Sequence, residues 1–285
     1  MRTLGRIMVA VDGSEYSLEA CNAAGRLAAV LETKIDVVKV VHPAQGGDDL
    51  AEASRILNKA CALASNGGMP AKGTIIEASG SVVDALVNYA SRKKCDLIVV
   101  GAKGSGGFRR ILLGSVSSGV VTHARVPVLV VRSLASFRGQ LFGHVLAAVD
   151  GSQASSLAVG MAAKLSKLTG ARLTILHVIS VPAAAYSSGS LSATTVEMKD
   201  RKSAEGYLTA AKEAAEVYGV GARTRIIEDL QSPVRGITDY ASENHVDLIV
   251  MGTRGIGGFK RLLLGSVATG VVSYARCSVL VMRGG

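Results

Sequence analysis

The stretch GAKGSGGFRRILLGS, from Gly101 to Ser115, decides the fold, and it returns as GTRGIGGFKRLLLGS from Gly252 to Ser266. It follows an apolar run, DLIVV (Asp96–Val100), that is typical of a strand buried on both faces. The sequence after Ser115 has the small polar start and apolar spacing of a helix. A strand, a glycine loop and a helix N-terminus together favour phosphate binding, because they bring backbone N–H donors and partial positive charge to one place.

The spacing of this motif is G-x2-G-x9-G-S. It differs from the dinucleotide-binding G-x-G-x-x-G, and no G-K-[ST] of a Walker loop follows it. The motif therefore predicts an anion site that belongs to neither of those two classes.

The chain is an internal duplication. Residues 101–132 and 252–283 align without gaps and are identical at 20 of 32 positions. AVDGS precedes the first motif and recurs 138 residues later, whereas the glycine motifs are 151 residues apart. The second copy therefore carries 13 extra residues, which fall between its second and third strands.

We predict a first domain over 1–134, a connector over 135–141 and a second domain over 142–285. The extra residues lie in Pro182–Asp200, which is rich in Ala, Ser, Thr and Gly. One interpretation is a mobile insertion that lengthens a loop and the helix after it. The other is a lid over a site, or a segment for docking and phosphorylation.

Composition narrows the class of protein. The chain of 285 residues is 48% apolar and 4% aromatic, with no Trp, which suits layered α/β domains. Each copy reads as alternating strands and helices, which predicts a parallel sheet with helices on both faces. The apolar runs are too short to span a bilayer, and the first one leads directly into a strand, so we expect a cytoplasmic protein without membrane contact.

Charge and cysteines point to few other partners. The net charge of +10 fits anion attraction and solubility, and the dispersed basic residues, without aromatic residues among them, make nucleic acid an unlikely partner. The four cysteines are scattered, so we expect them to be reduced and predict no metal site.

Two of the predicted strands end in residues that suit a ligand. Ligands of parallel sheets bind beyond the carboxyl ends of the strands, where the winding direction reverses. If the sheet reverses between the first and fourth strands, Asp12 faces the loop at Gly101, and Asp150 faces Gly252. A carboxylate opposite backbone donors suits a nucleotide, with the acid on ribose or base and the loop on phosphate.

Each part also has a purely structural interpretation. Asp12 can cap a turn, Gly101 and Gly104 can permit a tight connection, and Gly114-Ser115 can begin a helix. The basic loop residues can neutralise phosphate or remain solvated. They are Lys103, Arg109 and Arg110 in the first copy, and Arg254, Lys260 and Arg261 in the second.

The two copies resemble universal stress protein domains of the ATP-binding branch. The resemblance rests on VAVDGSEYS and AAVDGSQAS, together with the repeated G-x2-G-x9-G-S motif and the segments that flank it. It implies a Rossmann-like α/β fold of the adenine nucleotide alpha hydrolase type. Each domain would have a five-stranded parallel sheet of order 3-2-1-4-5.

The resemblance also implies which positions contact ATP. In the first copy these are Ala10, Asp12, Val40, Val100, Gly101, Gly104, Gly114, Ser115, Val116 and Ser117. In the second they are Ala148, Asp150, Val178, Met251, Gly252, Gly255, Gly265, Ser266 and Val267. Ser117 is replaced by Ala268 in the second copy, so loss of a hydroxyl donor predicts weaker ATP binding there, by about 0.5–1.5 kcal/mol.

The resemblance further implies that the fifth strands, VPVLVVR and CSVLVMR, pair antiparallel and make the chain an intramolecular pseudo-dimer. A homodimer of the chain and an unknown protein partner are further expectations.

The function that we expect is nucleotide-dependent regulation in a stress response, with ATP as the ligand and no catalytic residues. The alternative is a slow ATP hydrolase or phosphotransferase, with Asp12 or Asp150 and a bound Mg²⁺ contributing. His123 argues against shared catalysis, since Tyr274 replaces it in the second copy. A structural interaction module that binds no nucleotide is the third hypothesis.

Overall fold

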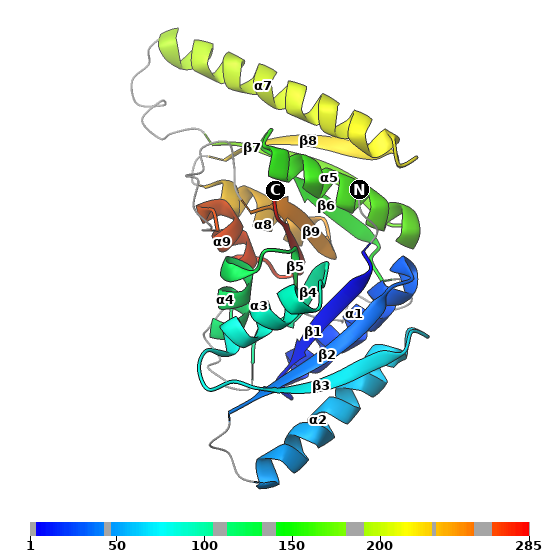
Figure 1. Cartoon of the computed structure of the whole chain (residues 1–285). Coiled ribbons are helices and arrows are strands. Elements are labelled where there is room, and N and C mark those ends of the chain that lie inside the picture. The colour runs from blue at the N-terminus through cyan, green and yellow to red at the C-terminus, as the bar shows by residue number, and fades with distance from the viewer. Residues whose placement is uncertain are drawn as a thin grey trace. The chain divides into compact units, whose positions relative to one another are not determined.

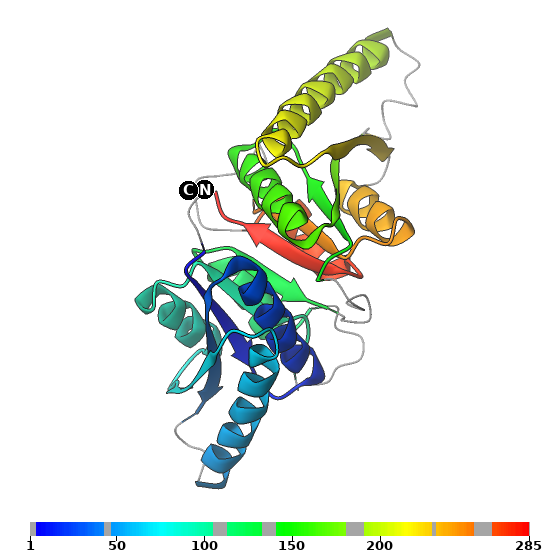
Figure 2. The ribbon, with the colours of Figure 1, turned by 90° about the vertical axis from the view of Figure 1, so that its right-hand side faces the viewer.

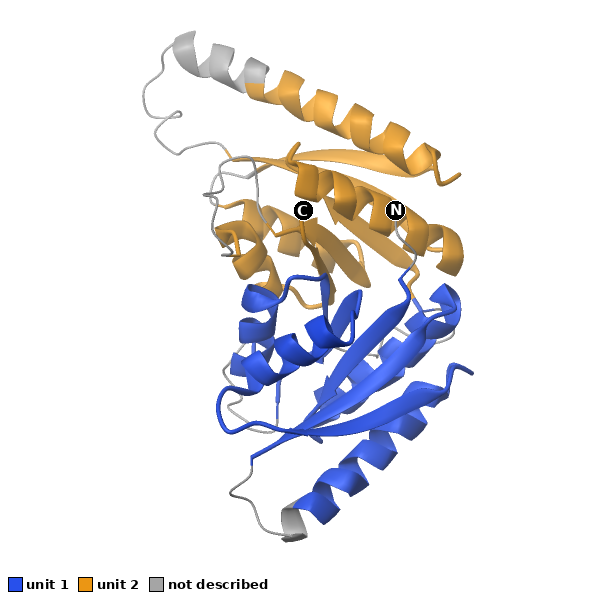
Figure 3. Cartoon of the chain, viewed as in Figure 1, with its two compact units in different colours: residues 1–141 blue, residues 142–285 orange. Residues whose placement is uncertain are grey.

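The computed structural model describes residues 4–42, 47–104, 113–132, 141–180, 191–229, 232–253 and 264–284 (Figure 1). Within helices and strands, the side chains of 47–49, 191–199 and 229 are not described. The chain divides into two compact units, residues 1–141 and 142–285, which Figure 3 colours separately. Each unit is treated by itself below.

Unit 1 alternates strands and helices along the chain. Its elements are β1 (Arg6–Val11), α1 (Glu15–Leu31), β2 (Lys34–Val41), α2 (Gly47–Ser65), β3 (Ala71–Glu77), α3 (Val82–Arg92), β4 (Leu97–Gly101), α4 (Ser115–His123) and β5 (Val128–Val131). The strands lie in the order β3-β2-β1-β4-β5, and all of these neighbours are parallel.

Unit 2 repeats this arrangement. Its elements are β6 (His144–Ala148), α5 (Gln153–Thr169), β7 (Arg172–Ser180), α7 (Leu191–Glu216), β8 (Ala222–Asp229), α8 (Pro233–Glu243), β9 (Leu248–Gly252), α9 (Ser266–Tyr274) and β10 (Ser278–Met282). The order β8-β7-β6-β9-β10 is again parallel throughout. The predicted fold class and the strand order 3-2-1-4-5 are therefore confirmed in each unit.

Helices cover both faces of each sheet. In unit 1, α1 and α2 pack together over the central strands, and α3 and α4 pack together on the other face (Figures 1 and 2). In unit 2, α5 pairs with α7 and α8 pairs with α9 in the same way. The central strands are buried on both faces: all five residues of β4 and of β6 are buried. This burial explains their continuous apolar sequences.

Local chemistry fixes where several helices begin. The N-caps of α1, α3, α5 and α8 are serines in extended conformation, and each side chain accepts a hydrogen bond from a backbone N–H of the first turn. They are Ser14, Ser81, Ser152 and Ser232.

A repeated aspartate ties the first strand of each unit to its fourth. Asp96 Oδ2 accepts hydrogen bonds from Gly5 N and Arg6 N, at 2.8 and 3.1 Å. Asp247 Oδ2 accepts from Gly143 N and His144 N, at 2.8 and 2.9 Å. The aspartate before each fourth strand is therefore a structural clamp at the edge of the sheet opposite the predicted site.

The second unit differs in the helix after its second strand. Helix α7 has 26 residues, whereas α2 has 19. Its first ten residues belong to the segment 182–200, so part of the extra sequence lengthens this helix. The remainder of that segment lies outside the described residues, and its predicted roles as a lid or docking segment stay predictions.

Candidate functional site

The predicted site residues gather at one edge of each sheet. In unit 1, β1 lies between β2 and β4, and the winding direction reverses between β1 and β4. Ala10 and Asp12 stand at the carboxyl end of β1, Val40 at that of β2, and Val100 and Gly101 at that of β4. Topology thus brings together residues that are about 90 positions apart, as the sequence predicted.

The two carboxylate oxygens of Asp12 face different parts of the site. Oδ1 accepts hydrogen bonds from Ser14 N at 2.9 Å and from Ser14 Oγ at 2.6 Å. These bonds hold a turn in which Gly13 has φ of 100°. The turn-capping interpretation of Asp12 is therefore confirmed for one oxygen, while Oδ2 faces another way.

The second oxygen of Asp12 meets the glycine loop. A Cβ atom at Gly104 would lie 2.6 Å from Asp12 Oδ2, which is closer than such atoms approach. Ser14 Oγ is also 3.3 Å from the carbonyl oxygen of Lys103. The end of β1 and the loop after β4 therefore face each other at close range. Because Gly104 has no Cβ atom, there is room for the carboxylate of Asp12 beside it.

Gly101 and Gly252 have a packing role. A Cβ at Gly101 would lie 2.6 Å from the carbonyl carbon of Tyr16, in the first turn of α1. At Gly252 it would lie 2.7 Å from Ala154 Cβ, in the first turn of α5. These glycines let the first helix of each unit approach the end of the fourth strand, a packing role that differs from the tight connection considered for Gly101 in the sequence.

The helices that follow the loops begin without a side-chain cap. Gly114 and Gly265 are the N-caps of α4 and α9, and no side chain accepts a hydrogen bond there. Gly114 N donates instead to Ala102 O at 2.8 Å, and Gly265 N donates to Thr253 O at 2.8 Å. Ser115 and Ser266 are exposed, and Val116 and Val267 are half-buried. Both helix ends therefore present backbone donors that no cap occupies.

The hydroxyl of Ser117 has a partner inside the protein. Ser117 is buried, and its Oγ donates to Gly101 O at 2.6 Å. Ala268 occupies the equivalent position of α9 and is also buried. A hydroxyl has only one proton, and that of Ser117 is used in the bond to Gly101 O. Replacement of Ser117 by Ala268 in unit 2 therefore removes a bond between the fourth strand and the helix after it. It does not remove a hydrogen-bond donor to ATP.

The turn after β6 repeats that after β1 with different neighbours. Asp150 Oδ1 accepts a hydrogen bond from Ser152 N at 3.0 Å, and Gly151 has φ of 83°. The ring of Tyr207, on α7, packs against Gly151, where unit 1 has Ile56 against Gly13. His177 Nδ1 is 2.8 Å from Val149 O, and its ring centroid is 5.6 Å from that of Tyr207.

The sequence reasoning did not single out Tyr207. The hydrogen bond between His177 and the carbonyl oxygen of Val149, just after β6, is a structural contact. Another missed feature is a serine pair: Ser17 Oγ accepts from Asp12 N and Gly13 N, both at 3.3 Å. The motif DGSxxS, which occurs in both copies, could have indicated this contact, since Ser155 in the second copy corresponds to Ser17.

The remaining described residues of the predicted site in unit 2 occupy the same edge. Ala148 is buried at the end of β6, Val178 is half-buried near the end of β7, and Met251 is buried in β9. Gly255 and the basic residues Arg109, Arg110, Arg254, Lys260 and Arg261 lie outside the described residues. Lys103 is described, and its Nζ is 5.9 Å from the centroid of the Tyr16 ring.

Burial makes Cys21 an unsuitable nucleophile near the site. Desolvation raises the pKa of Cys21 to about 12, with smaller contributions from Cys61 and Asp12. Such a thiol stays protonated at neutral pH. Within the part of the chain that the structure describes, no group of three His, Cys, Asp or Glu side chains could hold a metal ion. Among the described helices, none is long and apolar enough to cross a membrane.

Comparison with known proteins identifies the family. The sequence model of the Universal stress protein family matches residues 3–132 and 141–283. Universal stress protein Rv2623 of Mycobacterium tuberculosis is 34% identical over 211 residues, which are 71% of this chain and 66% of that protein. The chain thus spans just under two thirds of the length of that relative. Universal stress protein YxiE of Bacillus subtilis is 37% identical over 152 residues, 50% of this chain and 100% of that protein.

A solved structure agrees with the fold of the whole chain. The crystal structure of a universal stress protein from Archaeoglobus fulgidus covers 100% of both chains with a TM-score of 0.74 and 24% sequence identity. Because the family model matches both copies of the repeat, the chain belongs to the universal stress protein family.

Proposed function

We propose that each unit binds ATP at the carboxyl edge of its sheet, and that occupancy of the two sites regulates the protein in a stress response. The observation that carries the proposal is the approach of Asp12 Oδ2 to Gly104, beside a helix N-terminus without a side-chain cap. An acceptor oxygen and uncapped backbone donors are what the ribose and the phosphates of a nucleotide require.

The duplication supports the same ligand in both units. Asp150 has the turn geometry of Asp12, and α9 begins at a glycine as α4 does. The exposure pattern of residues 264–270 matches that of 113–119 position by position. A ligand that binds one edge thus meets a similar edge in the other unit, and two ATP molecules per chain are expected.

The role that we propose is binding without efficient catalysis. Two side chains that could serve catalysis have structural surroundings instead: His177 bonds Val149 O, and Cys21 is buried with a raised pKa. Mg²⁺ would accompany the phosphates of ATP, and the second oxygen of Asp12, which faces Gly104, is an acceptor beside the loop. The slow hydrolase stays the alternative hypothesis.

Calorimetric titration of the full chain with ATP tests the proposal, with Asp12→Asn and Asp150→Asn as variants. Asparagine keeps an Oδ1 that accepts from the backbone N–H of residue 14 or 152, so the turn remains. It replaces the oxygen that faces the loop with an NH₂ donor. We expect two sites in the parent protein. Each variant should weaken one of them by about 10–100-fold, as loss of a charged hydrogen bond predicts.

Two controls separate the hypotheses. Thermal unfolding of both variants without nucleotide should match that of the parent, which shows that the turn is intact. Chromatography of ATP incubated with the protein should show no accumulation of ADP, whereas steady accumulation would support the hydrolase. Absence of binding to ATP, ADP and AMP alike would refute the proposal in favour of a module that binds no nucleotide.

A further inference from the structure

Two side chains from other elements hold the turn that carries Asp150 in unit 2. The ring of Tyr207, on α7, packs on Gly151: a Cβ atom there would lie 2.6 Å from Tyr207 Cζ. His177, in β7, has its Nδ1 2.8 Å from the carbonyl oxygen of Val149. The residue before Asp150 and the residue after it are therefore both in contact with a ring from a neighbouring element.

The two rings also contact each other. The ring centroids of His177 and Tyr207 are 5.6 Å apart, and the ring planes are inclined by 58°, a tilted arrangement that suits aromatic rings. Both side chains are half-buried. Val149 N donates to Leu176 O at 2.9 Å, so β7 bonds Val149 through both of its backbone groups. The aromatic pair of His177 and Tyr207 thus joins β7 and α7 to the turn of Asp150.

Unit 1 lacks this aromatic pair. The position 138 residues before His177 is Lys39, and the position 151 residues before Tyr207 is Ile56. Ile56 packs on Gly13, where a Cβ atom would lie 2.8 Å from Ile56 Cδ1. Lys39 Nζ, however, donates to the carbonyl oxygen of the next residue of its own strand, at 3.3 Å. The two side chains of unit 1 therefore do not form a connected pair around the turn.

The turn of Asp12 has support of another kind. Ser14 Oγ donates to Asp12 Oδ1 at 2.6 Å and lies 3.3 Å from the carbonyl oxygen of Lys103. These contacts come from the turn itself and from the glycine loop. The contacts of the aromatic pair come from the second strand of unit 2 and from the helix after it, so substitutions in those elements should affect the turn of Asp150 in particular.

We propose that Tyr207 and His177 are positioning residues of the second nucleotide site, which hold the carboxylate of Asp150 in the orientation that receives the nucleotide. The inference rests on the proposed function, because it concerns the same carboxylate. Gly151 has φ of 83°, and a glycine that nothing packs against has many other conformations open to it. A ring against it restricts these, so less ordering is needed when the ligand binds.

The inference also connects the second site to the element that distinguishes the two units. Tyr207 lies on α7, the helix that part of the extra sequence lengthens. A change in the position of α7 would therefore alter the contact with Gly151 and, through it, the orientation of Asp150. The affinity of the second site should depend on this helix through the ring of Tyr207.

Calorimetric titration with ATP tests the role of the ring, in the full chain with the substitution Asp12→Asn so that the second site dominates the heat. Tyr207→Ala should weaken binding about 5–20-fold, because the apparent dissociation constant rises as the binding conformation of the turn becomes less populated. His177→Ala should act in the same direction. Tyr207→Phe keeps the ring and should restore the affinity, whereas a purely structural role would change the free energy of unfolding without changing the affinity.

Fluorescence supplies a second measurement. The chain contains no Trp, so Tyr207→Trp places a single reporter on α7. Its emission should change as ATP is added, with a midpoint at the dissociation constant of the second site. Ile56→Trp is the matched reporter for the first site. An emission at position 207 that stays constant while calorimetry records binding at the second site would overturn the positioning role.

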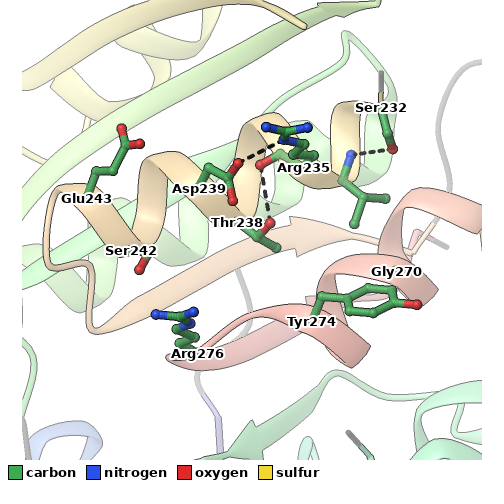
Figure 4. A pocket seen from close by; sticks show the side chains of 10 residues that line it. Ser232, Arg235, Thr238, Asp239, Ser242, Glu243, Gly270, Tyr274 and Arg276 are labelled. Carbon is green, nitrogen blue, oxygen red and sulfur yellow. Dashed lines mark hydrogen bonds and ion pairs between the residues drawn. The ribbon is translucent and has the colours of Figure 1, made fainter. Parts of the chain in front are cut away.

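A control variant removes a tyrosine ring from the other helical layer of unit 2. Tyr274, the last residue of α9, lines a groove between α8 and α9 (Figure 4). Tyr274→Ala should bind ATP as the Asp12→Asn protein does. If Tyr207→Ala and His177→Ala bind ATP equally well, the positioning role is wrong and the proposed function stands. If the parent protein binds no adenine nucleotide, the proposed function fails, and the positioning role fails with it.

Discussion

At the scale of single residues, Ser117 shows how a site position can hold the fold together. Its hydroxyl joins α4 to the last residue of β4, through a bond of 2.6 Å in a buried place. Ala268 cannot make this bond to Gly252. The two units therefore differ in how firmly the end of the fourth strand is attached to the helix after it.

Replacing Ser117 with Ala should lower the free energy of unfolding by about 0.5–1.5 kcal/mol, the usual net value of one hydrogen bond. ATP affinity at the first site should change little, since the proton serves Gly101. Urea unfolding and calorimetry measure the two quantities, and Ala268→Ser is the matched control. A tenfold loss of affinity with unchanged stability would restore the interpretation of Ser117 as a ligand donor.

His144 makes unit 2 sensitive to acid. It is buried, with Nδ1 3.0 Å from Asn244 O and Nε2 2.9 Å from Thr174 Oγ1. Desolvation lowers its pKa below 6.5. The Asn244 bond and Asp247 oppose this shift, whereas Arg172 and Arg223 add to it. The unfolded chain therefore takes up a proton at a higher pH than the folded one does, and the stability falls as pH decreases through about 6.5.

The variant His144→Gln removes the titration and keeps an amide that can bond both neighbours. Between about pH 7.5 and 5.5, the parent should lose more unfolding free energy than the variant, within the limit of about 1.4 kcal/mol per pH unit for one proton. Denaturant unfolding at each pH measures the difference. Equal losses in both proteins would show that His144 is not the sensitive group.

At the scale of secondary-structure elements, the same positions hold different polar pairs in the two units. Arg6 Nη1 donates to both oxygens of Asp36 at 2.9 Å, and Tyr89 donates to Asp36 Oδ2 at 3.3 Å. In unit 2 the two paired positions are His144 and Thr174. An ion pair and a neutral pair thus join the first two strands of otherwise similar sheets.

Close packing of α1 on α2 should make Gly25→Ala costly. Its Cβ would collide with the carbonyl of Ala64, which is backbone and cannot turn aside. Alanine normally stabilises a helix relative to glycine, but here overpacking should destabilise unit 1 by about 1–3 kcal/mol. Gly206→Ala, on α7 with open space at its Cβ, is the control and should stabilise slightly. Chemical denaturation measures the free energy of unfolding of both variants. A Gly25→Ala protein more stable than the parent would contradict the packing argument.

The sequence was sufficient for the elements and their order, because apolar runs, serine caps and the repeat are local signals. It was sufficient also for the pairing of Asp12 with the glycine loop, which follows from topology once the sheet reverses between the first and fourth strands. It could not show that Ser117 bonds Gly101 or that Tyr207 packs on Gly151. These contacts depend on side-chain directions between distant segments, which no spacing encodes.

At the scale of the whole molecule, the net charge of +10 should act on any anionic ligand. If the proposed loops receive phosphate, affinity for ATP should exceed affinity for AMP. The difference should shrink as NaCl rises from about 0.05 M to about 0.5 M, because salt screens exposed charges. Parallel titrations with both nucleotides measure it. Equal salt dependence for ATP and AMP would show that the phosphates lie away from the basic loops.

The predicted pairing of the fifth strands and the predicted connector stay predictions. Each unit nevertheless has a buried core of its own, with strands that pair within it. Loss of one nucleotide site by substitution should therefore leave the other functional, which the separate Asp12 and Asp150 variants also measure.

The aspartate clamps of Asp96 and Asp247 bear on how the chain folds during its synthesis. Asp96 closes onto Gly5 across 91 residues of chain, and Asp247 onto Gly143 across 104. The first strand of each unit is central, so one of its two edges waits for a partner until the fourth strand has emerged from the ribosome. Such long-range pairing is slow and leaves an apolar edge uncovered in the meantime. In this duplicated chain, β6 follows β4 in the sequence, so β1 can pair with β4 before β6 has emerged. The unpaired edges of β1 and β6, which are similar in sequence, are therefore exposed at different times.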